Sequence, residues 1–254
     1  MRTEILYEDK NIMVVRKPAG LAVQSAGIGQ PDVVSELKSY LAKLPGAGRP
    51  GKGEPYLGIV HRLDQPVEGL LVFAKDKKAA AALSKQLTEG ALNKHYYAVL
   101  CGYPDCPEGD LVDYLRKEGN VAVAVTGREQ EFADAKIAVL HYRILEEIND
   151  PSPLALADVT IGTGRFHQIR VQFAHAGFPL LGDTKYGMAA LKEAMPAQKY
   201  CGVALCAYSL ELVHPISGKK MGFRVVPKNP VFAGFAMKEL KKLTENETGI
   251  SKRG

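Results

Sequence analysis

The sequence predicts an α+β fold in which a largely antiparallel sheet carries helices on one face or at one end. Short apolar segments that favour strands follow one another along the chain, and polar turns separate them. No G-x-G-x-x-G motif follows a predicted strand, and no phosphate-binding P-loop pattern is present. These observations argue against a doubly wound fold and against chemistry that depends on a nucleotide cofactor.

The first half of the chain mixes strands and helices. Residues 11–17 (NIMVVRK) predict a strand, and residues 32–44 predict an amphipathic helix with an apolar face made by Val33, Val34, Leu37, Leu41 and Leu44. The glycine- and proline-rich segment 45–55, which carries Arg49 and Lys52, is expected to be a mobile loop. After an apolar strand that ends near residue 75, Asp76 is the expected N-cap of a helix that ends near Gly90.

Strands dominate the second half. The segments expected to form them are 95–100, 121–125, 135–145, 154–161, 203–213 and 222–226. One helix is expected to begin near Arg165, because Ile169, Phe173 and Ala176 form an apolar stripe and Gly177 can end it. The last segment, 236–254, has mixed charge and predicts a surface helix followed by a frayed tail.

Composition sets broad limits on function. The chain has 254 residues, 46% of them hydrophobic and 24% charged, which is enough to bury a core in one large domain or two packed lobes. No apolar run is long enough to span a membrane, and the first residues lack the apolar segment of a signal peptide, so a cytoplasmic location is expected. The net charge of +5 permits a polyanionic partner without requiring one.

The four cysteines form two C-x4-C pairs, Cys101 with Cys106 and Cys201 with Cys206. Structural zinc sites use tighter spacings, and Cys201 and Cys206 flank an apolar strand at an odd offset that points them to opposite faces. We therefore expect free thiols in a reducing compartment and no bound metal.

The stretch GIVHRLDQPVEGLLVFAK concentrates charge between two buried strands. His61, Arg62, Asp64 and Glu68 lie in the link between the apolar runs. A solvated polar turn explains such a link as well as a functional site does, since Asp, Gln and Pro are common turn residues. The residues alone leave both interpretations open, and Glu68, beside a glycine, is interpreted as a turn residue.

A second charged motif is GRFHQIR, at the start of the helix expected near Arg165. His167 and Arg170 lie three residues apart, on one face of its first turns. Arg170 stands between Ile169 and Val171, near the boundary of the core, where an arginine needs an anionic partner. Asp64 is a candidate for that partner.

Five ordered segments together resemble the RluA-type pseudouridine synthases. They are the opening ILYEDKNIMVVRKPAGLAVQ, the HRLD motif, the Lys94-His95-Tyr96 motif, GRFHQIR running into GDTKYG, and AYSLELVHPISGKK, so the resemblance spans about residues 5–232. It implies a long, mixed but mainly antiparallel sheet in two halves with a central cleft. It also implies isomerisation of uridines in RNA to pseudouridine without a cofactor.

The resemblance suggests roles for individual residues. Asp64 would be the catalytic carboxylate, either as a nucleophile toward the ribose anomeric carbon or as a base that takes a ribose proton, with Arg170 as its partner and Tyr96 stacked on the uracil. Residues expected to contact RNA, or to fill the space of a flipped base, are His61, Arg62, Lys94, Arg165, His167, Arg49 and Lys52.

Several departures from the family pattern bear on target choice. Val67-Glu68-Gly69 stands where many members have Thr-Ser-Gly, Phe166 stands where threonine is usual, and Gln172 stands where histidine is common. Residues 1–235 are expected to form the catalytic domain, without a separate N-terminal RNA-binding module. The expected partner is a stem-loop of ribosomal or transfer RNA, and the expected state is a monomer without an obligatory protein partner.

Two other functions remain open on the residues alone. One is a catalytically inactive RNA-binding protein of the same fold. The other is a nucleoside hydrolase or glycosidase, which also attacks an anomeric carbon. Glycosidases normally need two carboxylates, and Glu68 is the only candidate near Asp64 in the sequence.

Overall fold

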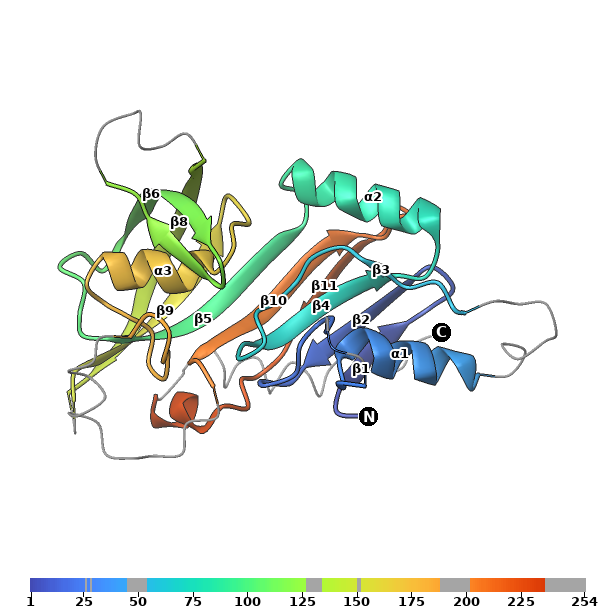
Figure 1. Ribbon diagram of the computed structural model, residues 1–254, viewed down its shortest axis with the longest axis horizontal. Coiled ribbons are helices and arrows are strands. Elements are labelled where there is room, and N and C mark those ends of the chain that lie inside the picture. Colours follow the sequence, from blue (N-terminus) through green and yellow to red (C-terminus); the bar gives the residue numbers. More distant parts are fainter. Residues whose placement is uncertain are drawn as a thin grey trace. The chain divides into compact units, whose positions relative to one another are not determined.

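The strands of the chain fall into two units in the computed structural model, which describes residues 1–25, 27, 29–44, 54–126, 134–149, 152–187 and 202–235 (Figure 1). The first unit combines Met1–Lys94 with Ala207–Val225, and the second combines His95–Cys206 with Val226–Gly254. The expected C-terminal helix at 236–254 and the loop residues Arg49 and Lys52 lie outside the described residues.

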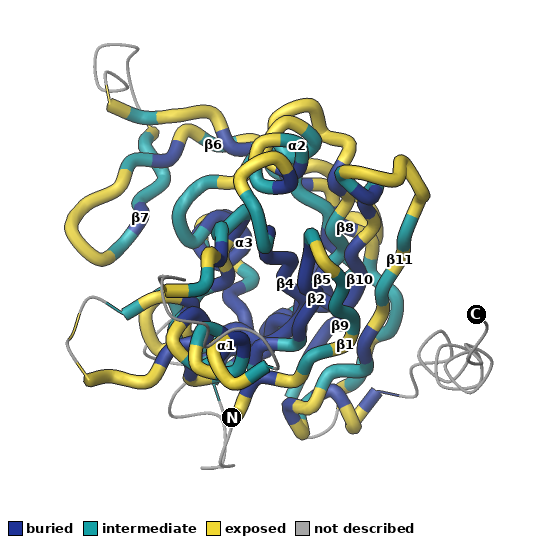
Figure 2. Tube along the Cα trace, turned by 90° about the vertical axis from the view of Figure 1, so that its right-hand side faces the viewer, coloured by how far each residue is buried: buried dark blue, intermediate teal, exposed yellow. Residues whose placement is uncertain are grey.

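The first unit is built on strands β1, β2, β4 and most of β10, which are neighbours in that order. Their bounds are Glu4–Glu8, Ile12–Lys17, Glu68–Ala74 and Leu205–Val213. Two short strands, β3 (Gly58–Ile59) and β11 (Lys220–Arg224), pair antiparallel with β4 and β10. Every residue of β4 is buried, which gives this unit its core (Figure 2).

Both helices of the first unit begin where the sequence predicts. The Asp32 carboxylate accepts a hydrogen bond from the Ser35 N–H at the start of α1 (Val33–Ala42), and Asp76 accepts one from the Ala79 N–H at the start of α2 (Lys77–Thr88). Of the expected apolar face, Val33, Val34, Leu37 and Leu41 are buried, whereas Leu44 lies beyond the end of α1 and is half-buried. Helix α2 packs against β3 and β4.

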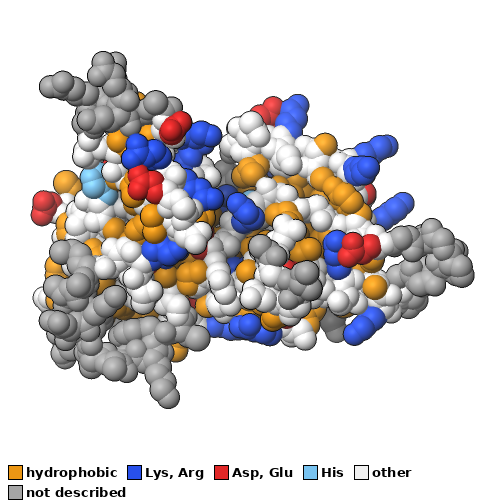
Figure 3. Space-filling view, viewed as in Figure 1, with side chains coloured by type: hydrophobic (Ala, Val, Ile, Leu, Met, Phe, Trp, Pro, Cys, Tyr) orange, Lys and Arg blue, Asp and Glu red, His pale blue; other side chains and the backbone are white. Residues whose placement is uncertain are grey.

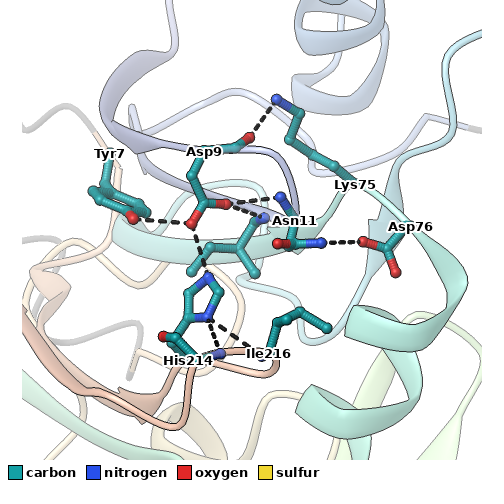
Figure 4. Close-up of polar contacts among 9 residues, drawn as sticks. Tyr7, Asp9, Asn11, Lys75, Asp76, His214 and Ile216 are labelled. Atoms are coloured by element: carbon teal, nitrogen blue, oxygen red, sulfur yellow. Dashed lines mark hydrogen bonds and ion pairs between the residues drawn. The ribbon is translucent and has the colours of Figure 1, made fainter.

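Polar contacts join elements far apart in the sequence of the first unit (Figure 4). The Asp9 carboxylate, between β1 and β2, accepts hydrogen bonds from the Tyr7 hydroxyl at 2.9 Å and from His214 Nε2 at 2.8 Å. His214 Nδ1 in turn accepts the backbone N–H groups of Ile216 and Ser217. The centroids of the Tyr7 ring and of the Phe223 ring on β11 also lie 5.8 Å apart, so these two side chains of β1 and β11 pack together.

The second unit contains a sequence of antiparallel neighbours, β5, β9, β8, β6 and β7. Their bounds are Asn93–Cys101, Leu154–Ile161, Lys136–Ile148, Glu108–Glu118 and Val121–Ala124. Helix α3 (Gln168–His175) packs against β6 and β7, and a short 3-10 turn covers Pro230–Gly234. The predicted α+β class, with mainly antiparallel strands and few helices, is confirmed.

Three local predictions need correction. Helix α3 begins at Gln168 rather than near Arg165, and His167 precedes it with a left-handed φ of 53°, so His167 is not on the first helical turn. Glu68 is not a turn residue, because it opens β4 and is only 4% exposed. Strands β1 and β6 have no counterpart among the predicted elements.

Candidate functional site

Asp64 lies on the link between β3 and β4. Its backbone carbonyl accepts the Val67 N–H at 3.1 Å, which closes a turn over residues 64–67. Leu63 and Val67 are buried on either side and anchor this turn, while Asp64 is half-buried and Arg62 is exposed. The link therefore places Asp64 on a turn that is fixed by a backbone hydrogen bond and by two buried neighbours.

Lys17, the last residue of β2, ties this turn to a second loop. Its side chain is fully buried, and Nζ donates to the carbonyls of Pro18 at 3.0 Å, Leu21 at 2.6 Å and Gln65 at 3.0 Å. The Gly20 N–H also donates to the Gln65 carbonyl at 2.8 Å. One ammonium thus fixes residues 18–21 against the turn that carries Asp64.

Two opposing effects act on the pKa of Lys17. Burial lowers its pKa to about 7, although the nearby Asp64 and Glu68 carboxylates favour the charged form. Sequence reasoning missed Lys17, whose only signal is a cation between the end of a buried strand and a proline.

This pKa predicts a pH effect on stability. The unfolded chain binds a proton at Lys17 up to about pH 10.5 and the folded chain only up to about 7, so the wild type should gain stability relative to Lys17→Met as the pH rises between these values. The slope is at most about 1.4 kcal/mol per pH unit. Urea denaturation at pH 7, 8 and 9 measures it, with exposed Lys85→Met as the control variant. Parallel stability curves for Lys17→Met and the wild type would rule the effect out.

Two further features support the base of the Asp64 turn. Glu68 Oε2 lies 3.6 Å from the Arg16 guanidinium, and both side chains are largely buried, so the unusual glutamate has a partner on β2. Gly69 has a φ of 129°, and a Cβ there would collide with the backbone of Ala207. The strand below the turn therefore requires glycine at 69.

His61 is placed differently from the sequence expectation of RNA contact. It is 8% exposed, and its Nε2 accepts the Val72 N–H at 3.3 Å. Burial, with the Lys94 charge as a second cause, lowers the His61 pKa to about 3, so the ring is neutral. This placement gives His61 a structural role beneath the turn. Lys94 is half-buried, and burial lowers its pKa as well.

Arg170 in the second unit has Asp183 as a partner. Nε donates to Oδ2 at 2.7 Å and Nη2 donates to Oδ1 at 2.9 Å, a two-pronged contact between buried side chains. Burial alone would raise the Asp183 pKa, but the hydrogen bonds and charge of Arg170 hold it below its usual value. The backbone N–H groups of Lys185 and Tyr186 also donate to Asp183. The expected need of Arg170 for an anion is thus met within its own unit.

The candidate residues divide between the units. The first unit carries His61, Arg62, Asp64 and Lys94, and the second carries Tyr96, Arg165, His167 and Arg170. Tyr96 is a buried residue of β5 opposite Val159, and Arg165 Nε donates to the Ile137 carbonyl at 2.9 Å. The pairing of Asp64 with Arg170 and the stacking role of Tyr96 stay predictions.

The described part of the chain offers neither a metal-ligand cluster nor a membrane-spanning helix. Within it, no group of three or more His, Cys, Asp or Glu side chains is arranged to hold a metal ion. Cys101, Cys106 and Cys206 are free thiols, and Cys201 lies outside the described residues. No helix there is long and apolar enough to cross a membrane.

Comparison with known proteins gives consistent matches. A family model described as RNA pseudouridylate synthase matches residues 11–175. Ribosomal large subunit pseudouridine synthase D of Zymomonas mobilis is 36% identical over 230 residues, covering 87% of this chain and 68% of that protein. An uncharacterized RNA pseudouridine synthase of Synechocystis is 38% identical, covering 85% of this chain and 63% of that protein. The chain thus spans about two thirds of the length of these relatives.

Solved structures agree with the sequence matches. Human RNA Pseudouridylate Synthase Domain Containing 4 is 25% identical and superposes with a TM-score of 0.68, covering 89% of each chain. Human RNA Pseudouridylate Synthase Domain Containing 1 is 19% identical with a TM-score of 0.70, covering 99% of this chain and 97% of that one, and shows a shared fold.

Proposed function

Because the chain belongs to the RNA pseudouridylate synthase family, we propose that it isomerises uridines of large-subunit ribosomal RNA, with Asp64 as the catalytic carboxylate. The reaction class is the isomerisation of uridine to pseudouridine. The bond from the ribose anomeric carbon to uracil N1 breaks, and a bond to C5 forms. C5 loses its proton and N1 gains one, so the product is an isomer of the substrate.

The fixed turn over residues 64–67 is the observation that supports Asp64 as the catalytic carboxylate. A carboxylate that attacks the anomeric carbon, or takes a ribose proton to form a glycal, must point steadily at one face of the ribose. Lys17 fixes the neighbouring carbonyls, and Leu63 and Val67 anchor the turn. The same carboxylate, or another base, then removes the C5 proton.

Arg170 and Tyr96 complete the proposed machinery. A guanidinium carries five N–H donors, so Arg170 can hold Asp183 with two and orient Asp64 with others. Tyr96 would stack on the target uracil once that base leaves its helix. Neither role needs a metal or an organic cofactor.

RNA would be gripped mainly through its phosphates. Lys and Arg side chains are spread over the face drawn in Figure 3, which suits a polyanion more than a small ligand. The residues proposed for these contacts are Arg62, Lys94, Arg165, His167, Arg49 and Lys52. Exposed Arg62 is also proposed to fill the space that the flipped uridine leaves.

The relatives motivate the choice of RNA. Several of them, from Zymomonas mobilis, Pseudomonas aeruginosa and Escherichia coli, are named for the large ribosomal subunit. We further propose that residues 1–235 act as the catalytic domain of a cytoplasmic monomer that needs no protein partner. Transfer RNA is the alternative substrate.

Turnover on defined RNA tests this substrate proposal. The purified protein is incubated with transcripts of large-subunit ribosomal RNA and, separately, with a transfer RNA pool, and pseudouridines are mapped in both. We expect new pseudouridine at a small number of stem-loop positions in the ribosomal transcript. Modification confined to transfer RNA would contradict the choice of substrate but not the reaction.

A further inference from the structure

Phe166 and His167, which directly precede α3 in the sequence, form a stack with Lys117 of β6 in the second unit. The Phe166 and His167 rings lie 3.8 Å apart between centroids at an interplanar angle of 22°. Lys117, on β6, places its Nζ 5.0 Å from the centroid of the Phe166 ring. Phe166 is half-buried and Lys117 is exposed, so a phenyl ring at the surface is covered by a cation at the end of a flexible chain.

Contacts with neighbouring residues hold the Phe166–His167 pair in place. His167 has a left-handed backbone, and its Nδ1 is 2.7 Å from the Tyr186 hydroxyl, which also accepts the Ala122 N–H of β7 at 2.7 Å. Phe166 and Tyr186 pack against a small buried cluster made by Leu115, Ala122, Ala138 and Val171. Fixed rings lose little freedom when a ligand stacks on them.

Two further cations are sequence neighbours of Phe166 and Tyr186. Arg165 directly precedes Phe166 in the sequence, and Lys185 directly precedes Tyr186, whose hydroxyl contacts His167. Lys185 Nζ donates to the Asn120 carbonyl of the β6–β7 turn at 2.6 Å. A planar aromatic face beside lysine and arginine is the combination that binds single-stranded nucleic acid, because bases stack and phosphates pair with the cations.

We propose that Phe166 is a stacking platform for an unpaired base of the RNA substrate, and that Lys117 moves from the ring to a neighbouring phosphate when the base arrives. The exchange is favourable because an exposed cation–π contact is weaker than base–aromatic stacking. Phe166 stands where the family that the sequence resembles usually has threonine. The platform would therefore contribute to the selection of an RNA target by this chain in particular. The proposal rests on the proposed function only in taking RNA as the ligand.

Fluorescence of 2-aminopurine tests the platform. Short single-stranded RNAs carry one uridine and 2-aminopurine at successive flanking positions, and the full chain is titrated into each. Stacking on Phe166 should quench one of these positions. Phe166→Leu should abolish that quench and weaken binding by about 5- to 100-fold, whereas Phe166→Tyr, which keeps the aromatic face, should retain both.

Lys117→Ala separates the two parts of the proposal. It should keep the quench, because the ring face is vacated, and lower the slope of log affinity against log salt by about 0.7. Lys85→Ala, which removes an exposed lysine beside Glu89 on α2, is the matched control and should keep the quench. An unchanged quench in Phe166→Leu, or a lost quench in Lys117→Ala, would overturn the platform while leaving the isomerase assignment intact. Absence of binding to these single-stranded RNAs by the wild type would also overturn the platform, whereas absence of turnover on the ribosomal transcript would overturn the isomerase assignment.

Discussion

Replacing Asp64 by asparagine is expected to lower pseudouridine formation by about 10⁴-fold or more while leaving RNA affinity within about twofold. Asparagine has nearly the same shape, but it can neither attack the anomeric carbon as a carboxylate nor accept a proton from ribose. Affinity persists because phosphate contacts supply most of the binding free energy.

The measurement compares single-turnover rates and equilibrium binding on one ribosomal transcript. Asp105→Asn is the matched control, since Asp105 is an exposed carboxylate with no proposed role in the reaction, and it should turn over like the wild type. Asp64→Asn with a rate within tenfold of the wild type would show that another group performs the chemistry.

Removing Arg170 is expected to cost both stability and activity. Arg170→Met leaves the Asp183 carboxylate buried without its guanidinium partner, and breaking a buried pair in this way costs about 3–5 kcal/mol in the free energy of unfolding. The double variant Arg170→Met with Asp183→Asn should recover part of that loss, because the amide carries no charge and can still accept the Lys185 and Tyr186 N–H groups.

Activity separates the two roles of Arg170. We expect the double variant to fold and remain inactive, because no guanidinium orients Asp64. Urea denaturation gives the stability, and turnover on ribosomal RNA gives the rate. Near-normal turnover in the double variant would mean that Arg170 serves Asp183 alone.

Local signals in the sequence predicted the capped helices well. Asp32 and Asp76 each bond to a backbone N–H three residues on, a contact that depends on nothing beyond the first helical turn. Strand β6 was missed because it is largely exposed, with Val112 at 58% and Tyr114 at 42%, and charged residues interrupt its apolar pattern. Helix α3 starts three residues later than predicted because His167 has a left-handed backbone conformation, which no pattern of residues in the sequence predicts.

The supporting residues of the site were harder to foresee than its carboxylate. Asp64 and Arg170 stand in recognisable motifs, whereas Lys17 is meaningful only through the carbonyls of Leu21 and Gln65, which the fold brings to it. Asp183 was overlooked as the partner of Arg170 because the two stand thirteen positions apart and the intervening turn has no simple period.

The structure also bears on the glycosidase alternative. That mechanism needs a second carboxylate near Asp64, and Glu68 is the only candidate close to Asp64 in the sequence. Glu68 is 4% exposed and lies 3.6 Å from Arg16 within the sheet, so it is committed to a structural contact. The alternative therefore loses the residue on which it depended.

Tritium release from RNA labelled at uracil C5 tests the central claim most directly. Isomerisation exchanges the C5 hydrogen for the bond to ribose, so the wild type should release tritium to water while the base stays attached to the RNA chain. Asp64→Asn should release none above background. Free labelled uracil, or RNA that retains all of its tritium after incubation with the wild type, would contradict the account.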